Sequence, residues 1–181
     1  MIAEATYRGI LAAYRGGNVI PNIVHQLEPL WCDDYYAAHP DAEIVSVDLK
    51  DTLSSFTYLF DIRLQRAVVA FGVPAFATHR RDPSRMAGHP LSAGSQFHRG
   101  HLMAHSIGGG TDINLVPQLG KLNVGEFRKL ERQVRDLAKQ NLQCLYWVRC
   151  IYNNDSQTPS NLEQCMIAPS GLLAFREFKN S

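Results

Sequence analysis

The spacing of apolar residues predicts two helices at the start of the chain. Apolar residues recur at helical spacing from Ile2 to Tyr14, and Gly16-Gly17 is typical of a helix end. A second, shorter helix is predicted over residues 22–31. Pro29 is expected to break it, because a proline inside a helix removes a hydrogen bond and clashes with the preceding turn.

Strand-like patterns dominate the remainder of the chain. Alternating or continuous apolar segments lie at 44–49, 55–60, 63–73, 99–105, 113–117, 143–152, 162–168 and 172–178. The second and third form a predicted hairpin, a loop is expected over 74–97, and Gly108-Gly109-Gly110 suggests a flexible break. This order favours an α+β fold with an antiparallel sheet. Residues 1–60 are expected to form an N-terminal helical and acidic segment, either separate from the unit over 61–181 or part of the same fold.

Residues 121–140 form the most regular predicted helix. Four apolar residues share one face, which is expected to pack on the sheet: Phe127, Leu130, Val134 and Leu137. Asn123 lies on the same side, and Glu131 lies at the edge of the apolar face. A basic stripe follows, formed by Arg128, Arg132, Arg135 and Lys139. From the residues alone, this stripe is either a phosphate-binding face beside a metal-binding edge or an ordinary solvated face.

Charge is distributed unevenly along a chain whose net charge is only +1. The first 60 residues hold three Lys or Arg against eight Asp or Glu, whereas the remaining residues hold 15 against nine. A basic second part suits a polyanionic partner such as a nucleic acid. Uneven clustering without a functional reason is the simpler alternative.

The cysteines and the N-terminus argue against several classes of protein. None of the four cysteines forms a Cys-x-x-Cys pair, which disfavours a zinc ribbon and favours buried, reduced thiols. Neither a secretory signal nor a membrane-spanning segment is predicted, because no apolar run is long enough. We therefore expect a protein without a membrane partner that is cytoplasmic or exported without a leader.

Three histidines, His98, His101 and His105, admit two interpretations. On a helix they would share one face and form a three-histidine zinc site. On a strand, His101 and His105 share a side and His98 points away. Gly100 and the triple glycine downstream disfavour a helix, so the strand interpretation is preferred.

The same segment resembles the DNA/RNA non-specific endonuclease family, whose ββα-metal (His-Me finger) active site combines two strands with a helix. The family pattern is Asp-Arg-Gly-His, then Asn-x-x-Pro-Gln, then a helix that opens with Leu-Asn and carries a glutamate eight residues later. This chain has His98-Arg99-Gly100-His101, Asn114-Leu115-Val116-Pro117-Gln118, Leu122-Asn123 and Glu131. The likeness is close over about residues 98–135 and looser to 178, and it is greatest to nuclease domains of bacterial polymorphic toxins.

The resemblance implies a role for each matching residue. His101 would be the general base that takes a proton from the attacking water. Asn123 would bind one Mg²⁺ directly, with Mn²⁺ as the alternative, and Glu131 would bind it through water. Arg135 would contact phosphate, Arg99 would contact phosphate or brace the strand, and Asn114 and Gln118 would support the site. Arg128 and Arg132 of the basic stripe are further candidates to contact or support the substrate. Arg80, Arg81 and Arg85 in the upstream loop are either further phosphate contacts or solvated charges.

His98 departs from the family, which has an aspartate at this position. A neutral histidine accepts one hydrogen bond but adds no negative charge, so the role of that aspartate is not transferred to His98. Weaker activity or a higher pH optimum is the expected consequence.

The leading hypothesis is therefore a Mg²⁺-dependent endonuclease that cuts DNA, with RNA as a further substrate, and leaves 5′-phosphate ends. The resemblance also implies a bacterial toxin with a cognate immunity protein. Two other functions compete with this hypothesis. One is a catalytically weakened relative that only binds nucleic acid, and the other is a zinc hydrolase that uses His98, His101 and His105.

Overall fold

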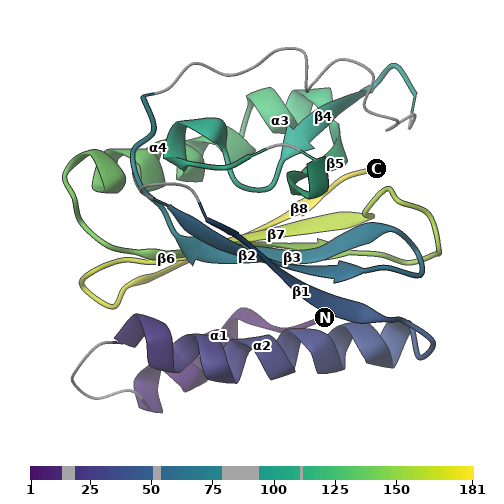
Figure 1. The fold of residues 1–181 in the computed structure, drawn as a ribbon, viewed down its shortest axis with the longest axis horizontal. Coiled ribbons are helices and arrows are strands. Elements are labelled where there is room, and N and C mark those ends of the chain that lie inside the picture. The colour runs from purple at the N-terminus through teal and green to yellow at the C-terminus, as the bar shows by residue number, and fades with distance from the viewer. Residues whose placement is uncertain (14–18, 51–53, 79–93, 111) are drawn as a thin grey trace.

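A six-stranded antiparallel sheet divides the molecule into two faces (Figure 1). The computed structural model describes residues 1–13, 19–50, 54–78, 94–110 and 112–181. In spatial order, the strands of the sheet are β1 (Ile44–Lys50), β2 (Ser55–Asp61), β3 (Arg66–Val73), β6 (Leu145–Ile151), β7 (Asn161–Ile167) and β8 (Leu173–Lys179). Every neighbouring pair is antiparallel, which confirms the predicted α+β class. Position 60, where the sequence suggested a boundary, lies inside β2.

Two helices cover one face of this sheet, α1 (Glu4–Ala13) and α2 (Val19–Ala38). The predicted break at Pro29 is wrong, because α2 runs through it for 20 residues. The buried stripe of α2 continues across the proline and consists of Ile23, Leu27, Trp31 and Tyr35. An interior proline costs about 3 kcal/mol, whereas each large apolar side chain gains about 1.5–3 kcal/mol on burial. Packing on the sheet therefore outweighs the local defect.

The opposite face carries a smaller layer made of a two-stranded ribbon and two helices (Figure 1). Its elements are β4 (Phe97–His101), the 3₁₀ turns η1 (His105–Ile107) and η2 (Asp112–Asn114), β5 (Leu115–Leu119), α3 (Gly120–Val124) and α4 (Phe127–Lys139). The extended segment predicted over 99–105 ends early, since β4 stops at His101. Arg80, Arg81 and Arg85 lie outside the described residues.

The single helix predicted over residues 121–140 is wrong, because the structure has two helices separated at Gly125. The backbone of Gly125 is not helical, with φ −103° and ψ −112°. A Cβ at this position would lie 2.6 Å from the carbonyl oxygen of Lys121, so only glycine fits. The predicted apolar face of α4 is confirmed, with Phe127, Leu130 and Val134 buried.

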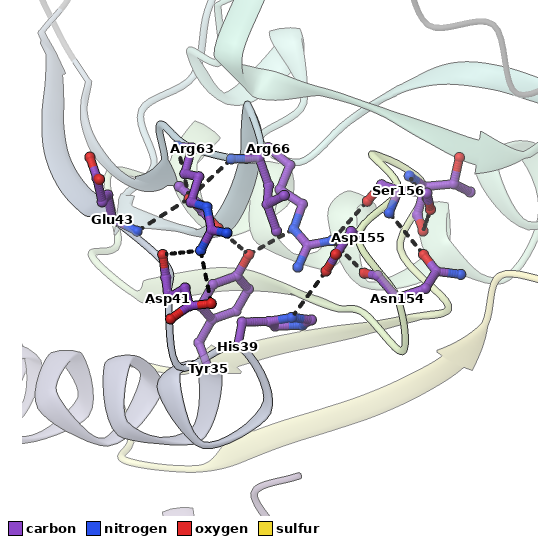
Figure 2. Close-up of polar contacts among 12 residues, drawn as sticks. Tyr35, His39, Asp41, Glu43, Arg63, Arg66, Asn154, Asp155 and Ser156 are labelled. Carbon is purple, nitrogen blue, oxygen red and sulfur yellow. Dashed lines mark hydrogen bonds and ion pairs between the residues drawn. The ribbon is translucent and has the colours of Figure 1, made fainter.

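A polar network joins the end of α2 to the β2–β3 hairpin (Figure 2). Tyr35 donates its hydroxyl hydrogen to Asp61 at 2.8 Å and accepts a hydrogen bond from Arg66 Nε at 2.7 Å. Arg66 Nη1 also donates to the carbonyl oxygens of Asn154 and Ser156, at 2.6 and 2.8 Å. The network therefore holds α2, the hairpin and the loop after β6 together. In the described part of the chain, no helix has the length and apolarity to cross a membrane.

Candidate active site

The β4–β5 ribbon and the two helices that follow it surround a cleft of about 430 Å³. Residues from β4, the turn after it, α3 and α4 line this cleft: Arg99, His101, Ala104, His105, Ser106, Asn123, Val124, Arg128, Glu131, Arg132 and Arg135. The structure thus brings together seven of the residues that the sequence suggested: His101, Arg99, Asn123, Glu131, Arg128, Arg132 and Arg135. Asn114, Gln118 and His98 do not line the cleft.

His101 is the last residue of β4 and pairs with Leu115 of β5. Because side chains alternate along a strand, His101 and Arg99 lie on one side of the ribbon while His98 and Gly100 lie on the other. The imidazole of His101 is half-buried at the cleft wall. An imidazole in this position can take a proton from a water molecule in the cleft.

Asn123 and Glu131 reach the same cleft from different helices. Burial raises the pKa of Glu131 to about 7, while the neighbouring Arg128 acts in the opposite direction. The amide nitrogen Nδ2 of Asn123 lies 3.3 Å from Nδ1 of His98. Asn123 is therefore contacted by a residue that does not itself line the cleft.

The donor set of the cleft suits a hard divalent cation. Asn123 offers a neutral oxygen and Glu131 a carboxylate, which are the ligand types that Mg²⁺ prefers. Among the described residues, no group of three or more His, Cys, Asp or Glu is arranged to hold a metal ion. An ion bound here would keep most of its water, as Mg²⁺ does, whereas structural or catalytic zinc sites use at least three protein ligands. The three-histidine zinc site therefore finds no support in this part of the chain.

Arginines give the cleft a strongly positive lining. Arg99, Arg128, Arg132 and Arg135 contribute four guanidinium groups around one carboxylate, that of Glu131. Arg135 also pairs with Asp136, at 3.3 Å. Planar guanidinium groups match the geometry of phosphate oxygens, so the cleft is suited to a phosphate backbone.

Asn114 supports the site without entering the cleft. Its side chain is buried and bonds to the backbone of the segment that follows β4. Oδ1 accepts a hydrogen bond from Met103 N at 2.7 Å, and Nδ2 donates to the carbonyl oxygens of Met103 and Gly110 at 2.8 and 2.7 Å. These three bonds fix the turn that carries His105 into the cleft.

Gln118 is buried against the glycine of the histidine motif. It lies opposite His98 in the ribbon, and a Cβ on Gly100 would come within 2.2 Å of its Oε1. Gly100 is thus required for close packing of the ribbon rather than for contact with substrate. Within the described residues, neither amide atom of Gln118 has a hydrogen-bond partner.

The triple glycine forms a turn directly after η1, whose residues His105 and Ser106 line the cleft. Gly108 adopts a left-handed conformation, with φ 93°, and ends η1. Gly109 donates its N–H to the carbonyl oxygen of Ala104 at 3.0 Å. The close packing of this turn, rather than flexibility, explains the glycines at 108 and 109.

Gly109→Ala is expected to destabilise the protein by about 1–3 kcal/mol, the usual result of forcing extra volume into a packed site. A Cβ at Gly109 would lie 1.8 Å from the carbonyl oxygen of Met103, which belongs to the backbone and cannot rotate away. Gly110→Ala is the matched control, because a Cβ there meets nothing within 4 Å. Urea denaturation of both variants measures the difference, and equal stability of the two would contradict the packing described.

Two polar residues that line the cleft were not assigned to a nuclease site from the sequence, besides the apolar Ala104 and Val124. His105 was considered only as a zinc ligand, and Ser106 was not singled out. Both belong to η1, a turn that has no periodic pattern. The hydrogen bonds of Asn114 to Met103 and Gly110, on either side of this turn, fix the position of both residues. No local sequence pattern predicts these bonds.

Comparisons with known proteins agree with this geometry. A model of the DNA/RNA non-specific endonuclease family matches residues 64–166, more than half of the chain. NucA from Streptococcus agalactiae with a magnesium ion bound has a TM-score of 0.60 at 16% identity, over 83% of this chain and 88% of that chain. The Sda1 nuclease with a bound zinc ion has a TM-score of 0.55 at 18% identity, over 77% and 84%.

No curated protein matches the chain. At identities this low, the structural likeness establishes a shared fold alone. The family model covers both ribbon strands, both helices of the cleft and all of its lining residues. The chain belongs to the DNA/RNA non-specific endonuclease family.

Proposed function

We propose that the cleft hydrolyses phosphodiester bonds of DNA, and of RNA as a further substrate, with Mg²⁺ as the metal ion. One observation carries this proposal: a histidine, an asparagine, a carboxylate and four arginines converge on one cleft. Mn²⁺ is the alternative ion. Contacts to the phosphate backbone carry no sequence information, so weak sequence preference is expected.

His101 is the proposed general base. It takes a proton from water in the cleft as that water attacks phosphorus, and the bond between phosphorus and the 3′ oxygen breaks. The phosphate then stays on the 5′ end of the downstream fragment. Guanidinium groups of Arg99 and Arg135 hold the phosphate oxygens in place during this step.

Asn123 and Glu131 are the residues that would hold the ion. Mg²⁺ would supply positive charge that stabilises the negative charge developing on the phosphate and on the leaving oxygen. Asn123 contributes its carbonyl oxygen, and Glu131 accepts hydrogen bonds from the water around the ion. Burial raises the pKa of the Glu131 carboxyl, and a nearby cation would favour its ionised form.

The metal and the product ends test this proposal together. Purified protein is incubated with plasmid and with RNA in Mg²⁺, then in EDTA, and then with Mg²⁺ restored. We expect cleavage that EDTA stops and Mg²⁺ restores, with fragments that a ligase joins without prior phosphorylation. Tightly bound stoichiometric zinc, retained during EDTA treatment with full activity, would favour the zinc hydrolase instead. Binding of DNA without cleavage would favour the weakened relative.

Arg132→Ala is expected to weaken DNA binding to a similar degree for every sequence. Loss of one phosphate contact should also reduce the slope of log affinity against log salt concentration by about 1. Lys129→Ala is the matched control, because Lys129 lies on the same helix but pairs with Glu126 at 2.6 Å and does not line the cleft. Fluorescence anisotropy in a salt series, with Ca²⁺ replacing Mg²⁺, measures both quantities. An equal slope change in the two variants would show that Arg132 contributes only general charge.

We also propose that the natural context is a bacterial toxin neutralised by an immunity protein. Support for this comes from the likeness of the motif segment to nuclease domains of polymorphic toxins. Induced expression in a bacterial cytoplasm should reduce viable counts for the wild type and not for His101→Ala. Equal growth of the strains that express wild type and His101→Ala, at equal protein levels, would contradict the proposal.

A further inference from the structure

His98 contacts a wall residue of the cleft from outside. Its side chain is exposed and lies on the side of β4 opposite to His101. Among the described residues, the hydrogen-bonding contact recorded for the imidazole is that of Nδ1 with Asn123 Nδ2, at 3.3 Å. Asn123, in turn, lines the cleft from α3. The two histidines of the motif therefore have different positions relative to the site.

We propose that His98 is a positioning residue that orients the carboxamide of Asn123 toward the metal ion. This inference rests on the proposed function, because it concerns the ligand of the ion. An amide nitrogen of asparagine can only donate, so Nδ1 of His98 must accept and the ring proton must reside on Nε2. The bond turns Nδ2 toward His98 and leaves Oδ1 for the cleft. A flipped carboxamide would present N–H groups to the cation, which cannot bind it.

Gly120 provides the space for this arrangement. It is the first residue of α3 and lies beneath the imidazole. A Cβ at position 120 would come within 2.6 Å of Nε2 of His98 and 3.0 Å of its Cε1. Any larger residue would push the ring away from Asn123. Gly120 therefore leaves the space that the His98 ring needs in order to contact Asn123.

The same geometry explains why a histidine stands where the family pattern has an aspartate. Aspartate and neutral histidine share one property that matters here, a lone pair able to accept a hydrogen bond. Nδ1 of His98 supplies that lone pair without a negative charge. Either residue at this position can therefore accept the hydrogen bond from Asn123, but His98 does so without a negative charge.

Ion binding measured without catalysis tests the proposal. Mn²⁺ titrations by isothermal calorimetry compare wild type with His98→Leu, which lacks an acceptor, and with His98→Gln, which keeps one without a charge. Loss of a residue that orients a metal ligand typically weakens binding by about 10–100-fold. We expect a loss of about tenfold for His98→Leu, at least partial recovery in His98→Gln, and a loss in Gly120→Ala similar to that in His98→Leu. Equal Mn²⁺ affinity in wild type and His98→Leu would overturn the proposal.

A second background separates orientation from general damage. In Asn123→Asp, the ligand has no N–H to orient, so His98→Leu should leave its Mn²⁺ affinity within about twofold. The same tenfold loss in both backgrounds would show that His98 does not act through the amide of Asn123. Wild-type protein that neither binds Mn²⁺ nor cleaves DNA would instead remove the proposed function. The two failures are therefore distinguishable.

Discussion

Replacing His101 with alanine is expected to lower the rate of DNA cleavage by about 10²–10⁴-fold, the usual contribution of a general base. His101 is half-buried at the wall of the cleft, and its removal leaves the ribbon and both helices in place. The melting temperature should therefore change little while kcat falls. Initial rates of plasmid nicking at saturating Mg²⁺ measure the effect.

His105→Ala is the matched control for that variant. His105 lines the same cleft but belongs to η1 rather than to the ribbon. We expect a much smaller loss of kcat for His105→Ala than for His101→Ala. A larger loss for His105→Ala than for His101→Ala, with both variants folded, would show that His101 is not the base.

Arg149→Met is expected to reduce the free energy of unfolding by about 3–5 kcal/mol, the usual result of leaving a buried charge without its partner. Arg149 and Glu163 are both buried on the sheet beneath the N-terminal helices, and Nη1 of Arg149 donates to Glu163 at 3.1 Å. Tyr7 of α1 donates to the other oxygen of Glu163 at 2.6 Å, and Asp34 of α2 accepts from Arg149 Nη2 at 2.5 Å. The cluster therefore ties both helices to the sheet.

The double variant Arg149→Met/Glu163→Gln is the control for this prediction. Removing both charges of a buried pair is far less harmful than removing one, so part of the lost stability should return. Urea unfolding gives the free energies. The value of kcat should be unchanged, because the cluster bonds to α1 and α2, which cover the face of the sheet opposite the layer that holds the cleft residues. A loss below 1 kcal/mol for Arg149→Met would contradict the structural role of the cluster.

We also propose that residues 1–60 unfold together with the remainder of the chain in one transition.

Much of the fold could be predicted from local patterns. The strands of the central sheet follow from period-two alternation or continuous apolar runs, and the buried face of α4 follows from its helical spacing. The resemblance to the family motifs selected His101, Asn123 and Glu131, which the structure brings to one cleft. The helices and strands depend on residues close together in the chain, whereas the three site residues are distant from one another and were selected by the family motifs.

Features that depend on distant contacts could not be predicted in this way. Pro29 is accommodated because the sheet packs against α2 on both sides of it, and Gly125 divides the predicted helix through a clash with the backbone of Lys121. His98 lies 25 residues from Asn123, and only the folded ribbon shows that they meet. For this reason the sequence presented His98 as a departure, whereas the structure places it behind Asn123.

The most direct test of the central claim is the time course of plasmid cleavage across a range of Mg²⁺ concentrations. Wild type, His101→Ala and Asn123→Ala are compared once their melting temperatures have been shown to be equal. We expect the wild type to cleave, His101→Ala to be nearly inactive at every concentration, and Asn123→Ala to require far more Mg²⁺. Intact DNA and RNA with the wild type at every Mg²⁺ concentration, or variants that cleave as fast as the wild type, would contradict the assignment of this cleft as the active site.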